Sequence, residues 1–143
     1  MNIKVKKLRP DAVIPFRGSE YAAGYDLYSL AYDVMLQPGE TFKFITGLAI
    51  EIPDGYFGAI FARSGLATKQ GVRPANCVGV IDSDYRGEIL VPLHNDNGTP
   101  QIIHQFDRLA QLVIIPYLNV NFNEVEELTE SKRDTGGFGS SGQ

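Results

Sequence analysis

Two carboxylates beside an aromatic ring give the segment Gly79–Gly87 the residue types of a catalytic site. Asp82 and Asp84 follow a short apolar run, and Tyr85 comes next. An ionised carboxylate accepts hydrogen bonds and can act as a general base, and the ring beside it offers a surface for packing a cyclic ligand. The competing interpretation is a plain hairpin turn, which the composition of this segment alone favours.

The segment that contains Arg63, Ser64 and Gly65 is a second candidate site. An arginine just before a helix start, followed by a serine and a glycine, forms a compact cradle for an anion. We predict a short helix over Leu66–Gln70, with Ser64 as its N-cap and Gly71 as its end. The alternative is an ordinary helix cap with a solvated arginine.

The end of the chain combines glycines with one aromatic ring. Residues 137–142 match the pattern G-x-G-x-x-G, but no strand–turn–helix context supports a dinucleotide site. Phe138 stands alone among the glycines, which suggests a lid that stacks on a planar ligand, although local composition favours a simple tail. Because the apolar pattern stops near Leu128, we predict a β domain over 1–128 and a mobile C-terminal lid over 129–143.

Other conspicuous motifs have plainer structural explanations. His94 and His104 lie in strand-like runs and are predicted to be structural. The tripeptide Asn97–Thr99 predicts a hairpin turn, and the basic run over residues 4–9 predicts the solvated face of an edge strand.

Period-two alternation predicts the strands that would position these residues. Residues 109–115 are apolar on both faces apart from Gln111, which predicts a central strand. Many short strands separated by turn signals indicate a sandwich, a jelly roll or a barrel. The alternating positions expected on buried faces are Ile3 and Val5; Phe42 and Phe44; Leu48, Ile50 and Ile52; Ile89, Val91 and Leu93; and Ile102, His104 and Phe106.

Length and composition exclude several classes of protein. The chain has 143 residues, which is typical of one domain. One cysteine and two histidines exclude an internal disulfide framework and a zinc site built from soft ligands alone. A net charge of −4 argues against broad nucleic-acid binding, and no apolar run approaches the length of a membrane span. With no secretory leader expected, we predict a reducing, cytoplasmic location.

Five ordered motifs resemble those of the trimeric dUTP pyrophosphatases. They are Ala22–Tyr28, Ala62–Ala67, Gly79–Gly87, Asp107–Leu112 and Arg133–Gly142. The resemblance implies an all-β, jelly-roll-like antiparallel domain with one short helix, assembled as a homotrimer with a swapped mobile C-terminal tail and active sites shared between subunits. It implies Mg²⁺-assisted hydrolysis of dUTP to dUMP and pyrophosphate, which keeps uracil out of DNA and supplies dUMP for thymidylate synthesis.

The resemblance also implies a role for each motif. Asp82 would be the general base for water attack on the α-phosphorus, and Asp26 would hold Mg²⁺ through water. Arg108 is implied either as a phosphate contact or as part of a structural ion pair. Phosphate contacts are implied for Arg63, Ser64, Gly65, Gln111 and Arg133.

Nucleoside selection is implied for one short segment together with the lid. The amide of Asn76 and the main chain of Val78, Gly79 and Val80 would read uracil, in a tight hairpin without room for a thymine methyl. Tyr85 would pack against deoxyribose. The lid would contribute Phe138, stacked on uracil, and the backbone of Gly139 and Ser140.

Two departures from the family pattern and two alternatives accompany the resemblance. Asp134 stands where glycine is usual, which places a negative charge near the triphosphate, and Ser141 stands where threonine is usual. One alternative is a dCTP deaminase of the related family, which would need a glutamate base. The other is a trimeric nucleotide-binding regulator in which catalysis is secondary.

Overall fold

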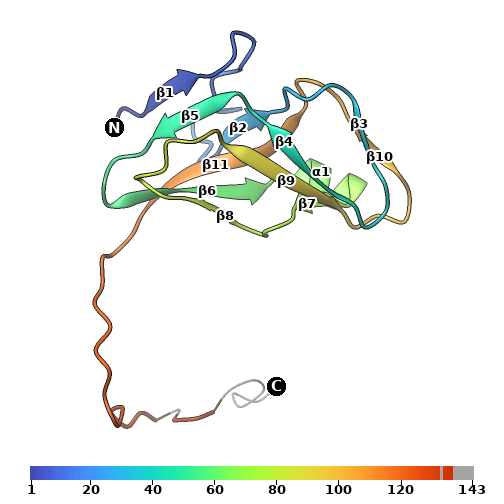
Figure 1. Ribbon diagram of the computed structural model, residues 1–143. Helices are drawn as coiled ribbons and strands as arrows, with labels where there is room; N and C mark the ends of the chain where they lie inside the picture. Colours follow the sequence, from blue (N-terminus) through green and yellow to red (C-terminus); the bar gives the residue numbers. More distant parts are fainter. Residues whose placement is uncertain (133, 137–143) are drawn as a thin grey trace.

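The computed structural model describes residues 1–132 and 134–136, and these residues form eleven strands and one helix (Figure 1). The first six strands are β1 (Lys4–Lys7), β2 (Tyr25–Tyr28), β3 (Val34–Leu36), β4 (Thr41–Ile45), β5 (Leu48–Glu51) and β6 (Tyr56–Ala62). After helix α1 (Ser64–Gln70) follow β7 (Val72–Pro74), β8 (Gly79–Ile81), β9 (Leu90–Asn95), β10 (Gln101–Ile103) and β11 (Arg108–Pro116).

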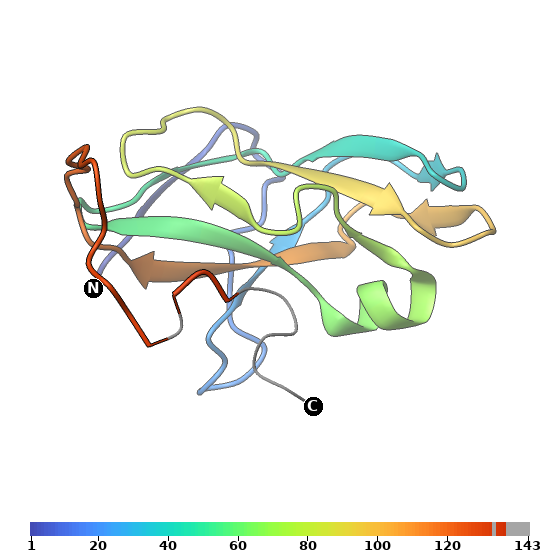
Figure 2. The same ribbon diagram turned by 90° about the horizontal axis from the view of Figure 1, so that it is seen from below.

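The strands form two larger sheets and two ribbons, all with antiparallel pairing. One sheet has the order β2-β11-β6-β8 and the other has the order β4-β9-β7, while β1 pairs with β5 and β3 pairs with β10. Figures 1 and 2 show the two sheets stacked as layers, with α1 at one end. This architecture confirms the predicted jelly-roll-like β domain with one short helix.

The core lies between the layers and draws apolar side chains from both. Leu27, Ile60 and Leu109 of the four-stranded sheet belong to the same buried cluster as Phe44 and Val91 of the three-stranded sheet. Two of the five predicted buried faces are confirmed in full, whereas Phe42 is 37% exposed beside the buried Phe44, and Ile3 and Val5 are only partly buried. The two confirmed faces consist of Leu48, Ile50 and Ile52 and of Ile89, Val91 and Leu93, all of which are buried.

Strand β11 is central, as its apolar sequence predicts. It pairs with β2 on one side and with β6 on the other, so both of its edges are covered. Its residues Leu109, Ala110 and Leu112 are buried, and Val113, Ile114 and Ile115 are half-buried. Gln111 is the polar residue inside this run, and it therefore needs a hydrogen-bonding partner within the fold.

The predicted buried face of Ile102, His104 and Phe106 is wrong. Strand β10 ends at Ile103, which is the buried residue, whereas Ile102 and Phe106 are about half exposed. At Phe106 the backbone turns through a left-handed conformation, with φ 66°, and its N–H donates to the carbonyl of Ser29. The alternation stops there because the chain leaves the ribbon.

The helix begins two residues earlier than predicted. Ser64 is its first residue and not its N-cap; the N-cap is Arg63, whose side chain makes no capping hydrogen bond. The predicted end is confirmed, because Gly71 adopts φ 64° and its N–H donates to the carbonyl of Leu66. A left-handed residue at this position favours glycine.

Two predicted hairpins are wrong. Asn97–Thr99 connects β9 with β10, which lie in different sheets. The segment from Asn76 to Tyr85 contains β8, which pairs with β6, whereas β7 before it and β9 after it belong to the other sheet. Neither turn joins two paired strands, because each leads the chain from one sheet to another. A hairpin and a change of sheet use the same types of turn residue, so the sequence of the turn does not reveal which sheet the next strand joins.

After β11 the chain leaves the domain as an extended arm, residues 117–132 (Figure 1). Its start is anchored by Tyr117, whose N–H donates to the carbonyl of Gly55 and whose ring packs edge-on against Phe57. Beyond it, Leu118 and Phe122 are 86% and 95% exposed. Nothing in the described residues forms a helix with the length and apolarity that crossing a bilayer requires.

Candidate active site

Four polar side chains converge where strands β2, β11 and β6 lie side by side. Gln111 of β11 is directly opposite Asp26 of β2 and opposite Phe61 of β6. Arg63 follows the end of β6, and Arg108 begins β11. Cross-strand partners share one face of a sheet, so this register brings residues that are far apart in sequence to one place.

The Asp26 carboxylate lies between two guanidinium groups. Arg63 donates from Nε to Oδ1 at 3.0 Å, and Arg108 donates from Nη1 to Oδ2 at 3.3 Å. Arg63 also donates from Nη1 to the main-chain carbonyl of Arg108 at 3.4 Å. Two cations and one anion leave a net positive charge, which favours an anionic ligand at this point. Of the two roles considered for Arg108, a phosphate contact or a structural ion pair, the ion pair is present, with Asp26 as its partner.

A β-bulge lets Arg108 reach that carboxylate. The β2–β11 register shifts between Arg108 and Ala110, and the intervening Leu109 is fully buried. Strict alternation would place Arg108 and Gln111 on opposite faces of the strand. The extra residue changes the phase, as bulges near functional sites commonly do.

Gly24 is required by the position of Gln111. The Gln111 side chain donates from Nε2 to the carbonyl of Ala62 at 2.9 Å and fills the space beside Gly24. A Cβ at Gly24 would collide with Oε1 of Gln111. Sequence reasoning did not single out this glycine, although its place just before β2 and Asp26 is a signal that could have found it.

Tyr28 is a further neighbour of Asp26. Burial raises the pKa of the Tyr28 phenol above its ordinary value of 10.0, and the Asp26 carboxylate adds to this effect, while Arg108 and Arg63 oppose it. The ring stacks on Phe16 at a centroid distance of 5.8 Å. Tyr28 is therefore a neutral phenol at neutral pH.

The start of α1 is open beside this cluster. Arg63 has extended backbone angles, φ −89° and ψ 130°, so the chain turns sharply into the helix. Ser64 and Gly65 are exposed, and apart from the adjoining residues and the backbone of the helix itself no atom lies within 4 Å of the place where a Gly65 side chain would begin. The backbone here is accessible to a ligand.

The turn that follows β7 contains Asn76, Cys77 and Val78. Cys77 adopts φ 58°, which is unusual for a residue with a side chain, and the Val78 N–H donates to the carbonyl of Asn76 at 2.6 Å. Gly79 is buried against Ile60, while the Val80 side chain is 59% exposed. The segment from Asn76 to Val80 thus offers polar backbone groups and apolar surface together.

Asp82 and Tyr85 are brought together by a tight turn after β8. The Tyr85 N–H donates to the Asp82 carbonyl at 3.2 Å, and the Tyr85 hydroxyl donates to the carbonyl of Glu88 at 2.9 Å. A Cβ at Gly87 would collide with the Tyr85 ring. The ring is therefore held in place, and the Asp82 side chain stays exposed beside it.

One chain does not bring Asp82 and Arg63 together. Ile81 of β8 lies opposite Gly58, whereas Arg63 follows the other end of β6. Four residues lie between Gly58 and Arg63, and the five steps along the chain span about 17 Å at the rise of a β-strand. The candidate residues thus form two separate clusters on the described part of the chain.

The predicted lid residues Arg133, Phe138, Gly139 and Ser140 lie outside the described residues, as does Ser141. Within residues 1–132 and 134–136, no group of three or more histidine, cysteine, aspartate or glutamate side chains could hold a metal ion. A carboxylate has roughly four lone-pair sites, and Asp26 uses one oxygen for each arginine, so it can still accept hydrogen bonds from metal-bound water.

Comparisons with known proteins agree on one family. The family model described as dUTPase matches residues 11–142. A deoxyuridine 5′-triphosphate nucleotidohydrolase of Nautilia profundicola is 48% identical over 143 residues, covering 100% of both chains. The structure of Staphylococcus bacteriophage 80alpha dUTPase with dUPNHPP is 31% identical, covers 99% of both chains and superposes with a TM-score of 0.90. A mutant dUTPase of S. aureus phage phi11, described with a structural Mg(II) ion, is 29% identical, covers 89% of this chain and 98% of the other, and has a TM-score of 0.79.

Proposed function

Because the chain belongs to the dUTPase family of dUTP diphosphatases, we propose that it hydrolyses dUTP to dUMP and pyrophosphate by water attack on the α-phosphorus. The observation that carries the proposal is the cationic cluster around Asp26, whose two arginines suit a triphosphate. The reaction would remove dUTP before uracil enters DNA and would supply dUMP for thymidylate synthesis.

Asp82 is proposed as the general base that orients and deprotonates the attacking water. The proposal is supported by its exposed carboxylate and by the rigid turn that holds it next to Tyr85. A carboxylate accepts hydrogen bonds, which is what a group that orients and deprotonates water must do.

The phosphates are proposed to bind at the cluster of Arg63, Ser64, Gly65 and Gln111, with Arg108 beside them. Support comes from the net positive charge and from the open backbone at the helix start. Asp26 would hold Mg²⁺ through water, since one carboxylate suffices for an ion that keeps several waters and takes its other oxygens from phosphates. When bound, the ion would neutralise charge on the phosphates.

Uracil is proposed to bind along the segment from Asn76 to Val80. Its exposed amide and main-chain groups can match the uracil edge, where a carbonyl stands in place of the cytosine amino group. A site that hydrogen-bonds one edge rejects the wrong one because buried polar groups lose their partners. Tyr85 would pack against the deoxyribose.

A homotrimer with shared active sites is proposed because a single chain separates the two clusters. The phosphate cluster of one subunit would face Asp82 and Tyr85 of a second. The arm supports association, since its exposed Leu118 and Phe122 need a surface to cover them. A groove of about 710 Å³ between β1 and β2 has an apolar lining that includes Val5, Ile14 and Ile114 and would suit the arm of another copy.

Residues 129–143 are proposed as a lid over the domain formed by residues 1–128. Arg133 would reach the γ-phosphate, Phe138 would stack on uracil, and the backbone of Gly139 and Ser140 would contact phosphate. Closure of such a lid excludes water from the reaction. A cytoplasmic location stays a prediction.

Hydrolysis in ¹⁸O-labelled water tests the reaction. With dUTP and Mg²⁺ we expect the label in dUMP, because the attacked phosphorus stays with the nucleoside. Label in pyrophosphate would place the attack on the β-phosphorus and contradict the proposal. Incubation with dCTP tests the deaminase alternative, for which release of ammonia would be the positive result.

A further inference from the structure

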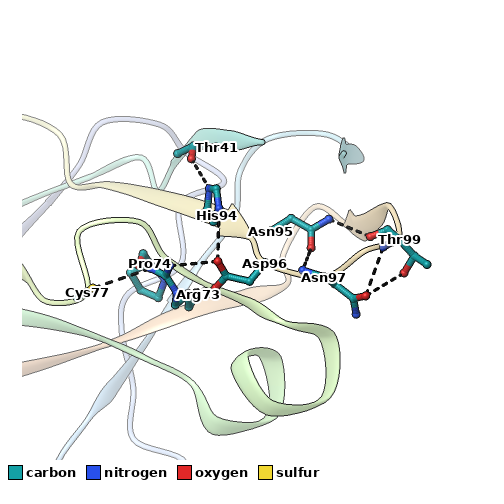
Figure 3. Close-up of polar contacts among 9 residues, drawn as sticks. All are labelled: Thr41, Arg73, Pro74, Cys77, His94, Asn95, Asp96, Asn97 and Thr99. Atoms are coloured by element: carbon teal, nitrogen blue, oxygen red, sulfur yellow. Dashed lines mark hydrogen bonds and ion pairs between the residues drawn. The ribbon is translucent and has the colours of Figure 1, made fainter. Parts of the chain in front are cut away.

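The turn that is proposed to read uracil is held from outside by an ion pair on the three-stranded sheet (Figure 3). Arg73 of β7 donates from Nε to Oδ2 of Asp96 at 2.6 Å and from Nη2 to Oδ1 at 3.1 Å. Such a two-point pairing fixes the plane of the guanidinium group. The third nitrogen, Nη1, is thereby aimed away from Asp96 and toward the turn.

That third nitrogen contacts the turn at two points. Nη1 donates to the carbonyl of Pro74 at 3.2 Å and lies 3.9 Å from Sγ of Cys77. The same Pro74 carbonyl accepts the Cys77 N–H at 3.2 Å. Cys77 has the left-handed φ of 58°, which a residue with a side chain keeps only when its surroundings enforce it. Arg73 supplies part of that enforcement.

The ion pair is itself anchored across the whole sheet. Thr41 of β4, His94 of β9 and Arg73 of β7 are direct cross-strand partners in one row. His94 contacts Oδ1 of Asp96 through Nε2 at 3.4 Å, and its Nδ1 is 2.8 Å from the Thr41 hydroxyl. The imidazole ring of His94 therefore lies between Thr41 and Asp96. The row thus links β4 to the turn.

We propose that Arg73, oriented by Asp96, is a positioning residue for pyrimidine recognition: it sets the conformation of Ala75–Val78 and so the affinity and selectivity for the uracil ring. This inference rests on the proposed function of the turn. Folding stability alone does not explain the Arg73–Asp96 ion pair. Both side chains are partly exposed, at 38% and 44%, and surface ion pairs contribute little to the free energy of folding.

Three variants test the role of Arg73, and a matched pair elsewhere serves as the control. Arg73→Ala removes the contacts, Arg73→Lys keeps the charge without the planar group, and Asp96→Asn keeps the shape but releases Arg73. The pair Arg9–Asp11 has the same two-point geometry, with both distances 3.2 Å and similar exposure, but contacts no part of the turn. Arg9→Ala is therefore the control.

Steady-state kinetics with dUTP and dCTP give the main readout. We expect each of the three variants to raise KM for dUTP roughly tenfold, to leave kcat within about twofold and to reduce the preference for dUTP over dCTP, while Arg9→Ala changes none of these. Unchanged KM and preference in all three folded variants, with a wild-type enzyme that is active and selective, would overturn this inference alone. A wild-type protein that does not hydrolyse dUTP would instead overturn the proposed function on which it rests.

Cys77 offers a second readout that does not depend on turnover. It is the single cysteine of the chain and lies in the turn, so a thiol reagent reports on this place only. We expect dUMP to slow the labelling of Cys77 in the wild type, and Arg73→Lys to need roughly tenfold more dUMP for the same protection. Equal protection in both proteins would contradict the positioning role, even where a variant had altered kinetics.

Discussion

Gly24 approaches Gln111 so closely that a side chain at position 24 would occupy the place of the Gln111 amide. The amide is held there by its hydrogen bond to the carbonyl of Ala62, in the row that also contains Asp26. A residue with no side chain is thus part of the geometry of the proposed phosphate cluster, although it offers no functional group of its own.

Gly24→Ala should therefore lower activity without unfolding the protein. The new methyl group would displace Gln111, and a misplacement of about 1 Å in a site can reduce turnover by up to roughly 100-fold. Steady-state hydrolysis of dUTP and a thermal melt measure the two effects. Gly18→Ala, in the same loop with nothing within 4 Å of the new atom, is the control and should behave as the wild type.

Asp82→Asn should abolish most of the turnover and spare binding. The amide keeps the shape of the side chain but cannot act as a base, which typically costs 10²–10⁴-fold. Single-turnover hydrolysis and titration with the analogue dUPNHPP separate the two effects. Asp54→Asn, an exposed carboxylate in the turn before β6, should leave both unchanged. A near-normal rate in Asp82→Asn would assign the base to another residue.

Two inactive variants should restore each other when their chains are mixed. If Asp82 of one subunit meets Arg63 of another, refolding Asp82→Asn chains with Arg63→Ala chains in equal amounts leaves about one quarter of the sites with both residues intact. We expect a corresponding fraction of wild-type activity. No recovery, with mixed trimers confirmed by tagged chains, would mean that both residues of a site come from one subunit.

The arm after β11 should contribute to assembly. Replacing Leu118 and Phe122 by serine removes two exposed apolar side chains, each of which can contribute about 1.5–3 kcal/mol when fully buried. Light scattering over a dilution series should show dissociation at higher protein concentration than for the wild type. Serine at Tyr21 and Tyr32, which are also exposed but lie elsewhere, is the control. An unchanged trimer would remove the arm from the interface.

Asp134 should weaken the lid through its charge and its backbone. It adopts φ 45°, a conformation that favours glycine, and its N–H donates to Ser131. Asp134→Asn removes only the charge and should tighten binding of dUPNHPP roughly two- to fivefold at low salt, with a smaller gain at high salt. Asp134→Gly also removes the backbone strain and should tighten it further. Weaker binding in both variants would contradict this account.

The sequence predicted those parts of the fold that are determined by residues close together in the chain, such as a long apolar strand or the end of a helix. The apolar run of β11 indicated a central strand, and its pairing with β2 and β6 along both edges confirms that position. Gly71 indicated the helix end because glycine readily adopts the left-handed backbone that ends many helices, and it has that backbone here. By contrast, β10 has three residues and two adjacent isoleucines, which is too short a pattern to determine which of them is buried.

The members of the candidate site could be proposed from the sequence, but their arrangement could not. The motifs identified Asp26, Arg63 and Asp82 by resemblance, yet the contact between Asp26 and Arg63 spans 37 residues and depends on strand register. The position of Arg108 depends on a bulge for which the neighbouring residues give no sequence signal. Strand register and bulges depend on packing between strands that are far apart in the chain. They could therefore not be predicted from the local pattern of one sequence.

The length of β6 also has a consequence for how activity responds to the amount of protein. Because one end of this strand lies beside Asp82 and the other leads into Arg63, an isolated subunit of the proposed trimer would carry every residue of a site and no working site. Specific activity would then fall steeply once dilution separates the subunits. In a cell, the rate of dUTP hydrolysis would then rise more steeply than in proportion to the concentration of the chain.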